Sequence, residues 1–151
     1  MKLKNFNLKK KVFIIAEVGN NHEGNFVLAK KLVHQAAKAG ANAIKFQIFK
    51  TENFVRKKDK KRFKQLKRFE LLHKQFQFLK KLAHKYKLKF IATPLDLYSA
   101  DFVIKNADII KIASGDNNFY PLIDKVLKSK KPVIISTGMT NASQIKILTN
   151  Y

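Results

Sequence analysis

Short apolar runs alternate with longer amphipathic segments along the chain, and the alternation repeats five times. The runs are too uniformly hydrophobic to expose either face to water, which is typical of parallel strands covered by helices. The longer segments place apolar residues at the spacing of a helix with one buried face. We therefore predict strands at residues 11–17, 42–48, 89–93, 108–113 and 132–137, and helices at residues 26–39, 69–86, 98–105, 120–128 and 141–148.

This β-α alternation defines an α/β fold, and two architectures accommodate it. One is an open, doubly wound sheet. The other is a (β/α)8 TIM barrel of which the chain holds about the first five β/α units. A whole barrel takes about 250 residues. The 151 residues of this chain would therefore make just over half of one.

Composition narrows the class of protein. With 46% hydrophobic and 28% charged residues, the chain is typical of a soluble globular domain. The absence of cysteine excludes disulfides and thiolate metal sites. No apolar run approaches the roughly 20 residues of a membrane span, and residues 12–16 are too short for the core of a signal peptide. We expect a cytoplasmic protein with no membrane partner, a basic tail at residues 1–10 and one domain from residue 11.

The net charge of +22 favours anionic partners. Nucleic acid is disfavoured, however, because 29 of the 32 basic residues are lysine, whereas nucleic-acid readers depend on the forked guanidinium of arginine. The densest basic run, residues 56–68, has nine basic residues in thirteen. We interpret it as a solvated loop and helix start. The alternative is a basic lip that attracts an anionic substrate.

Polar side chains gather near the carboxyl ends of the predicted strands, where α/β proteins bind their ligands. Two of them, Lys45 and Lys111, sit at equivalent positions inside apolar strands. Burying an ammonium without a partner is costly, and lysines, hydroxyls and glycine-loop amides together suit a phosphorylated, carboxylated small molecule. The candidate site consists of Glu17, Lys45, Gln47, Thr93, Lys111, Ser114, Asp116 and Ser136.

Each of these signals has a simpler explanation when taken alone. A lysine in an edge strand can extend its ammonium to water, and Ser-Gly-Asp at residues 114–116 is a common turn. Glu17 can cap a nearby loop. His22 has no second ligand candidate nearby, so we interpret it as a surface histidine. The equivalence of the two lysines favours the anion site.

Five motifs occur in order and at suitable spacing. They are FIIAEVGNNHEGN at 13–25, AIKFQIFK at 43–50, FIATPLD at 90–96, KIASGDNNFYPLI at 111–123 and PVIISTGM at 132–139. Together they resemble the N-acetylneuraminate (sialic acid) synthase family, and the resemblance covers nearly the whole chain from residue 13. It implies condensation of phosphoenolpyruvate with an N-acetylated hexosamine to a nine-carbon 2-keto sugar acid, with release of phosphate.

The resemblance also assigns roles to the candidate residues. It implies that Glu17 and Gln47 lie near the sugar, and that Glu17 and Asp116 have catalytic roles. Asp116 stands where the family usually has glutamate, which shortens the carboxylate by one methylene. The resemblance further implies that the phosphate and carboxylate of phosphoenolpyruvate are held by Lys45, Thr93, Lys111, Ser114 and Ser136.

The family fold is a (β/α)8 barrel, usually followed by a small antifreeze-like domain. Residues 11–151 resemble only the N-terminal part of that barrel, so we expect its C-terminal half and the antifreeze-like domain to be absent from this chain. The family's divalent metal, Mn or Mg, is held by two histidines on later strands that have no counterpart here. A homodimer, or a second chain carrying the other half-barrel, is therefore an open partner alternative.

Two other functions remain open at this stage. One is a related phosphoenolpyruvate-dependent synthase that takes an aldose phosphate, although the AEVGNNHEG opening at residues 16–24 favours the sialic acid branch. The other is a catalytically silent half-barrel that serves as a binding or assembly module.

Overall fold

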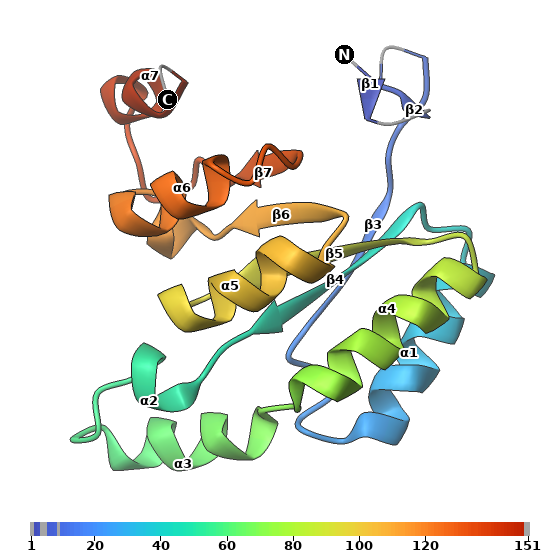
Figure 1. The fold of residues 1–151 in the computed structure, drawn as a ribbon, viewed down its shortest axis with the longest axis horizontal. Coiled ribbons are helices and arrows are strands. Elements are labelled where there is room, and N and C mark those ends of the chain that lie inside the picture. The colour runs from blue at the N-terminus through green and yellow to red at the C-terminus, as the bar shows by residue number, and fades with distance from the viewer. Residues whose placement is uncertain (1, 4–5, 9, 150–151) are drawn as a thin grey trace.

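The centre of the fold is a five-stranded parallel sheet (Figure 1). The computed structural model describes residues 2–3, 6–8 and 10–149. The strands neighbour one another in chain order, without the reversal that marks a doubly wound sheet. The α/β fold and the parallel sheet are thereby confirmed. The strands are β3 (Ile15–Gly19), β4 (Ala43–Ile48), β5 (Lys89–Pro94), β6 (Ile109–Ile112) and β7 (Val133–Ile135).

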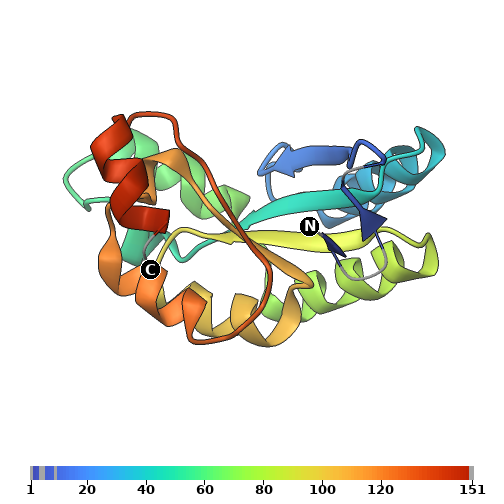
Figure 2. The same cartoon turned by 90° about the horizontal axis from the view of Figure 1, so that it is seen from above.

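Four helices bury one face of this sheet. Figure 2 shows α4, α5 and α6 side by side along it, and α1 packs beside α4. Their apolar faces and the side chains of the strands form one continuous core. The helices are α1 (Phe26–Lys38), α4 (His73–Lys85), α5 (Leu97–Asn106) and α6 (Tyr120–Leu127), and α7 (Ala142–Thr149) follows β7.

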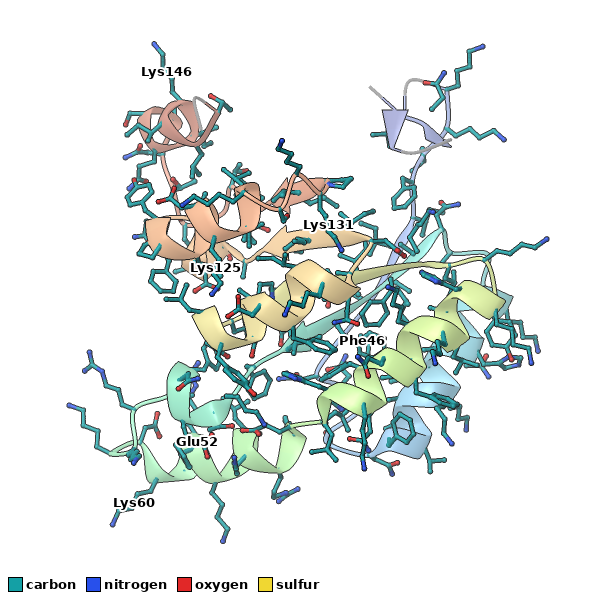
Figure 3. All side chains as sticks on the ribbon, in the orientation of Figure 1. Phe46, Glu52, Lys60, Lys125, Lys131 and Lys146 are labelled. Atoms are coloured by element: carbon teal, nitrogen blue, oxygen red, sulfur yellow. The ribbon has the colours of Figure 1, made fainter. Side chains whose placement is uncertain are left out.

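The alternation of side chains along each strand separates two faces. In β4, Ile44, Phe46 and Ile48 join the core beneath the helices. Phe46 is fully buried between the sheet and α4, with its ring centroid 6.2 Å from that of Phe76 (Figure 3). Burial of one such side chain is worth about 1.5–3 kcal/mol. The intervening residues of each strand therefore face the opposite side, where α1, α4, α5 and α6 do not pack.

The N-terminal segment differs in detail from the expected basic tail. Two short strands, β1 (Lys2–Leu3) and β2 (Phe6–Asn7), pair antiparallel within it. The first sheet strand begins at Ile15 rather than at residue 11, and the side chain of Val12 is 82% exposed. In the described part of the chain, no helix has the length and apolarity needed to cross a membrane.

Residues 51–86 contain more helices than the predicted single helix from 69 to 86. Two further helices, α2 (Thr51–Phe54) and α3 (Lys60–Phe69), precede α4 and lie beyond the carboxyl end of β4 (Figure 1). The helix breaks at Glu70, which is extended and turns its carboxylate back to accept a hydrogen bond from the Thr51 amide at 2.8 Å. A loop that leads into a helix at Lys60, with mostly exposed side chains, agrees with the interpretation of residues 56–68 as a solvated loop and helix start. The helix is, however, a separate one that ends at Phe69.

The helix ends follow their sequence signals. Asn25 caps α1 by accepting a hydrogen bond from the Leu28 amide at 3.0 Å. Gly40, two residues beyond α1, has a φ of +77°, which glycine adopts without strain. Pro121 lies in the first turn of α6, where its missing N–H has no helical acceptor to lose.

Candidate functional site

The candidate site occupies the face of the sheet opposite the helices. Toward the amino ends of the strands, this face is apolar and is built from Ala43, Ile91 and Ile109. Toward the carboxyl ends it becomes polar, because the next residues of the same parity are charged or hydroxylated. Five adjacent strands thus bring most of the predicted site residues onto one surface.

Lys45 is the most deeply buried charge of this surface. The residue is only 9% exposed, in the second strand rather than at a sheet edge. Its ammonium forms an ion pair with the Glu17 carboxylate at 2.6 Å and donates a hydrogen bond to the Thr93 hydroxyl at 3.3 Å. The Glu17 side chain remains 54% exposed. The alternative in which this lysine extends to water from an edge strand is therefore wrong for Lys45.

Lys111 occupies the equivalent place in β6 with different partners. Its ammonium donates hydrogen bonds to the Ser136 hydroxyl and, at 2.6 Å, to the backbone carbonyl of Ile112. Burial lowers the pKa of Lys111, and the positive charge of Lys45 lowers it further, while Glu17 and Asp116 act in the opposite direction. The two ammonium groups are therefore close enough to repel one another. An anion between them would relieve that repulsion.

Asp116 and Ser114 lie in the 3₁₀ turn η1 (Ser114–Asp116), directly after β6. Burial raises the pKa of the Asp116 carboxyl, and the nearby charge of Lys111 partly offsets this effect. A raised pKa suits a carboxyl group that exchanges a proton with substrate or water. Ser114 packs against the loop after β7, since a Cβ built on Gly138 would lie 3.5 Å from the Ser114 Cβ.

A cavity of about 720 Å³ lies between α3 and the carboxyl ends of β4 and β6. The turn at Gly19 brings Glu17 and Gln47 together, since a Cβ there would lie 3.3 Å from the Glu17 Oε1 and 3.8 Å from the Gln47 Oε1. Helix α3 supplies the outer wall through one helical face. The cavity is lined by Asn20, Gln47, Phe54, Arg62, Gln65, Leu66, Phe69, Leu95, Ala113, Gly115 and Asp116.

The cavity wall includes side chains that the sequence analysis did not single out. Arg62 and Gln65 belong to the run interpreted as a solvated loop and helix start, and both are exposed as that interpretation requires. They also line the cavity, which is the position that the basic-lip alternative needs. The signal was present in the sequence: residues 62, 65, 66 and 69 have the three- and four-residue spacing of one helical face. This spacing was overlooked because the run was interpreted from its many basic residues.

Two buried carboxylates fasten the loops around the cavity, and both were also missed. Asp96, 3% exposed, accepts hydrogen bonds from the Lys50 amide at 2.8 Å and the Ser99 amide at 2.7 Å. It thus ties the end of β4 to the start of α5. Glu70 holds α3 against α2, and hydrogen bonds from Thr51 and Lys67 lower its pKa even though burial acts to raise it. An Asp-x-x-Ser pattern after a strand is a usable signal for the first of these.

His22 is buried, so its interpretation as a surface histidine is wrong. It is 1% exposed and packs against Phe46 and Phe76, with ring centroids 6.1 and 6.5 Å away. Its Nδ1 accepts a hydrogen bond from the Gly24 amide at 3.1 Å, and its Nε2 has no hydrogen-bond partner among the residues that the structure describes. Burial lowers its pKa to about 4. A neutral imidazole at this place stabilises the loop after β3, which carries Asn20 to the cavity.

The residues present do not fit the divalent metal that the family resemblance implies. Within the described ranges, no three His, Asp or Glu side chains are grouped so that they could hold such an ion.

The NeuB family profile matches residues 32–150. An uncharacterized protein of Methanocaldococcus jannaschii is 48% identical over 143 residues, which cover 91% of this chain and 42% of that protein. The N,N'-diacetyllegionaminic acid synthase of Campylobacter jejuni is 39% identical over 155 residues, which cover 93% of this chain and 46% of the synthase.

The fold has a similar solved relative. The crystal structure of N-acetylneuraminic acid (sialic acid) synthetase from Leptospira borgpetersenii, in complex with citrate, superposes with a TM-score of 0.85 at 36% identity. The match covers 92% of this chain and 49% of the synthetase. The chain thus spans less than half the length of the curated relatives described above. Because the family profile covers most of its length, the chain belongs to the NeuB family.

Proposed function

We propose that this chain carries the phosphoenolpyruvate-binding part of a sialic acid-type synthase. The reaction condenses phosphoenolpyruvate with an N-acylated amino hexose to a nine-carbon 2-keto sugar acid and releases phosphate. Residues 11–151 would form the first five units of a (β/α)8 barrel. The observation that carries the proposal is the polar layer in which Lys45 and Lys111 face the same space from β4 and β6.

The anion end of the site is built around these lysines. Thr93 lies beside Lys45, and Ser136 beside Lys111. The hydroxyls hold the ammonium groups in place and can turn to donate to a phosphate or carboxylate oxygen. Ser114, in the turn after β6, adds a third hydroxyl. A ligand that carries both a phosphate and a carboxylate can offer a separate anionic group to each ammonium.

The sugar end of the site is the cavity beneath α3. Its amides, from Asn20, Gln47 and Gln65, suit the hydroxyls of a sugar, while Leu66 and Phe69 offer apolar surface to an acyl methyl group. Its volume of about 720 Å³ is in the range of small-molecule sites. Legionaminic acid and sialic acid synthases among the relatives support an acylated amino sugar as the class of substrate.

The chemistry assigns a role to each group at the boundary between the two ends. C3 of phosphoenolpyruvate attacks the sugar aldehyde, which forms the new C–C bond and leaves a cation at C2. The former aldehyde oxygen takes up a proton and becomes a hydroxyl. Water adds to C2 and gives up one proton, and the resulting C2 hydroxyl loses its own proton to the departing phosphate as the C2–O bond to phosphate breaks, which gives the ketone and inorganic phosphate. Asp116, whose pKa is raised by burial, accepts the proton of that water. Glu17 orients the sugar, and Lys45 and Lys111 hold C3 in line with the aldehyde.

Calorimetric titration with phosphoenolpyruvate tests the anion site. We expect Lys111→Met to weaken binding at least tenfold, whereas Lys105→Met, which removes the same charge from the exposed face of α5, should change it less than twofold. Near-normal affinity of the Lys111 variant would rule out the anion-clamp role. Mass analysis of products from candidate sugars then tests the reaction. Binding without turnover, alone or with a partner half-barrel, would favour the silent binding module.

A further inference from the structure

Asn117 connects the loops that follow β6 and β7. It comes directly after η1 and is 6% exposed. Its side-chain amide donates hydrogen bonds to the backbone carbonyls of Ser136, at 3.4 Å, and Gly138, at 2.9 Å. Both amide protons of one buried side chain are thus directed at the segment that carries the Ser136 hydroxyl.

The end of β7 has few other restraints in the described part of the chain. β7 is three residues long, and β6 is its only partner among the described strands. Beyond its last residue, the Ser136 amide donates a hydrogen bond to the Ile112 carbonyl at 3.1 Å. Ser136 is therefore held from one side by Ile112 and from the other by Asn117, and its hydroxyl is directed at the Lys111 ammonium.

We propose that Asn117 is a positioning residue for the anion site: it clamps the backbone after β7 so that the Ser136 hydroxyl stays on the Lys111 ammonium. Without the clamp, the loop at 136–138 moves away from β6, and the hydroxyl is lost both to Lys111 and to the bound anion. The consequence for phosphoenolpyruvate rests on the proposed function. The effect on the loop itself does not.

Two variants and two matched controls test this role. Asn117→Ala removes the amide, and Asn117→Asp keeps its shape but replaces the donor with an acceptor. The neighbouring Asn118 is exposed, so Asn118→Ala and Asn118→Asp reproduce the truncation and the added negative charge without touching the clamp. We expect phosphoenolpyruvate to bind each Asn117 variant about tenfold more weakly than its Asn118 counterpart, the effect of losing one or two hydrogen bonds.

Hydrogen exchange of the Ser136 amide supplies a readout that needs no ligand. We expect it to exchange about tenfold faster in the Asn117 variants than in the Asn118 controls, while amides in β4 and β5 are unchanged. Faster exchange in a protein that never binds phosphoenolpyruvate would refute the proposed function and leave the clamp standing. Normal Ser136 exchange and normal affinity in both Asn117 variants, even with a lower melting temperature, would overturn the inference. The nearly isosteric Asn117→Asp keeps the test valid if the alanine variant unfolds.

Discussion

The buried imidazole of His22 predicts a specific loss of stability in mild acid. Burial lowers its pKa from 6.5 to about 4 in the folded protein, while the unfolded chain retains the ordinary value. Between these two values the unfolded state binds more protons, so stability rises with pH across this window and is lost as pH falls. One pKa unit corresponds to about 1.4 kcal/mol. Protonation of His22 in the unfolded state should therefore lower the free energy of unfolding, relative to pH 7.5, by about 2 kcal/mol at pH 5 and about 3 kcal/mol near pH 4.

Urea unfolding from pH 7.5 to pH 4.5 at constant ionic strength measures this effect in the wild type and in His22→Asn. The asparagine oxygen can replace Nδ1 as acceptor for the Gly24 amide, and asparagine does not titrate. The variant is less stable at every pH because it leaves a cavity. Between pH 7.5 and pH 5, however, its free energy of unfolding should fall by about 2 kcal/mol less than that of the wild type. All other titrating groups cancel in the difference. Parallel curves would show that the imidazole is protonated without penalty and would refute the reasoning.

Three further predictions concern the loops and the anion site. Because its pKa is lowered, Lys111 should lose its proton below the pH at which an ordinary lysine does, so phosphoenolpyruvate affinity should fall as pH rises toward 10; affinity that is constant up to that pH contradicts this. Glu70→Gln should loosen α3 and speed tryptic cleavage within residues 56–68 several-fold, whereas unchanged cleavage would show that the carboxylate does not anchor the helix. Gly24→Ala should destabilise the fold by more than 2 kcal/mol, because its Cβ would lie 2.0 Å from the Arg68 carbonyl oxygen. Gly40 has a similar positive φ but open space around it, so Gly40→Ala should destabilise the fold by only about 1 kcal/mol. Equal losses of stability in chemical unfolding would exclude the clash at Gly24.

The arrangement of the lysines could be predicted because strand alternation is a local rule. Once residues 42–48 and 108–113 are assigned to parallel strands, Lys45 and Lys111 fall on the same face, and the hydroxyls at the ends of β5 and β7 fall beside them. Periodicity and the position along a strand are sufficient for this inference. The same reasoning placed the helices that cover the other face.

The residues that sequence reasoning missed act through partners distant in the chain. Asn117 contacts a loop 19 to 21 residues away, and Glu70 reaches back 19 residues to the start of α2. His22 is buried by rings from β4 and α4. No periodicity within a short window encodes such contacts, because they depend on where the chain returns after a strand or helix. The break at Glu70 shows the same limit, since a tertiary hydrogen bond overrides the helical pattern.

The different partners of the two lysines suggest how the site is prepared for an anion. Lys45 is balanced by the carboxylate of Glu17, which remains half-exposed. Under the proposed function, this carboxylate can turn toward water or the sugar when the phosphate binds. Lys111 forms its described hydrogen bonds with neutral oxygens only, and both burial and the charge of Lys45 disfavour its ammonium form. A bound anion stabilises that ammonium directly. We infer that Lys111 supplies most of the electrostatic gain on binding, and Lys45 fixes the geometry in which the gain is realised.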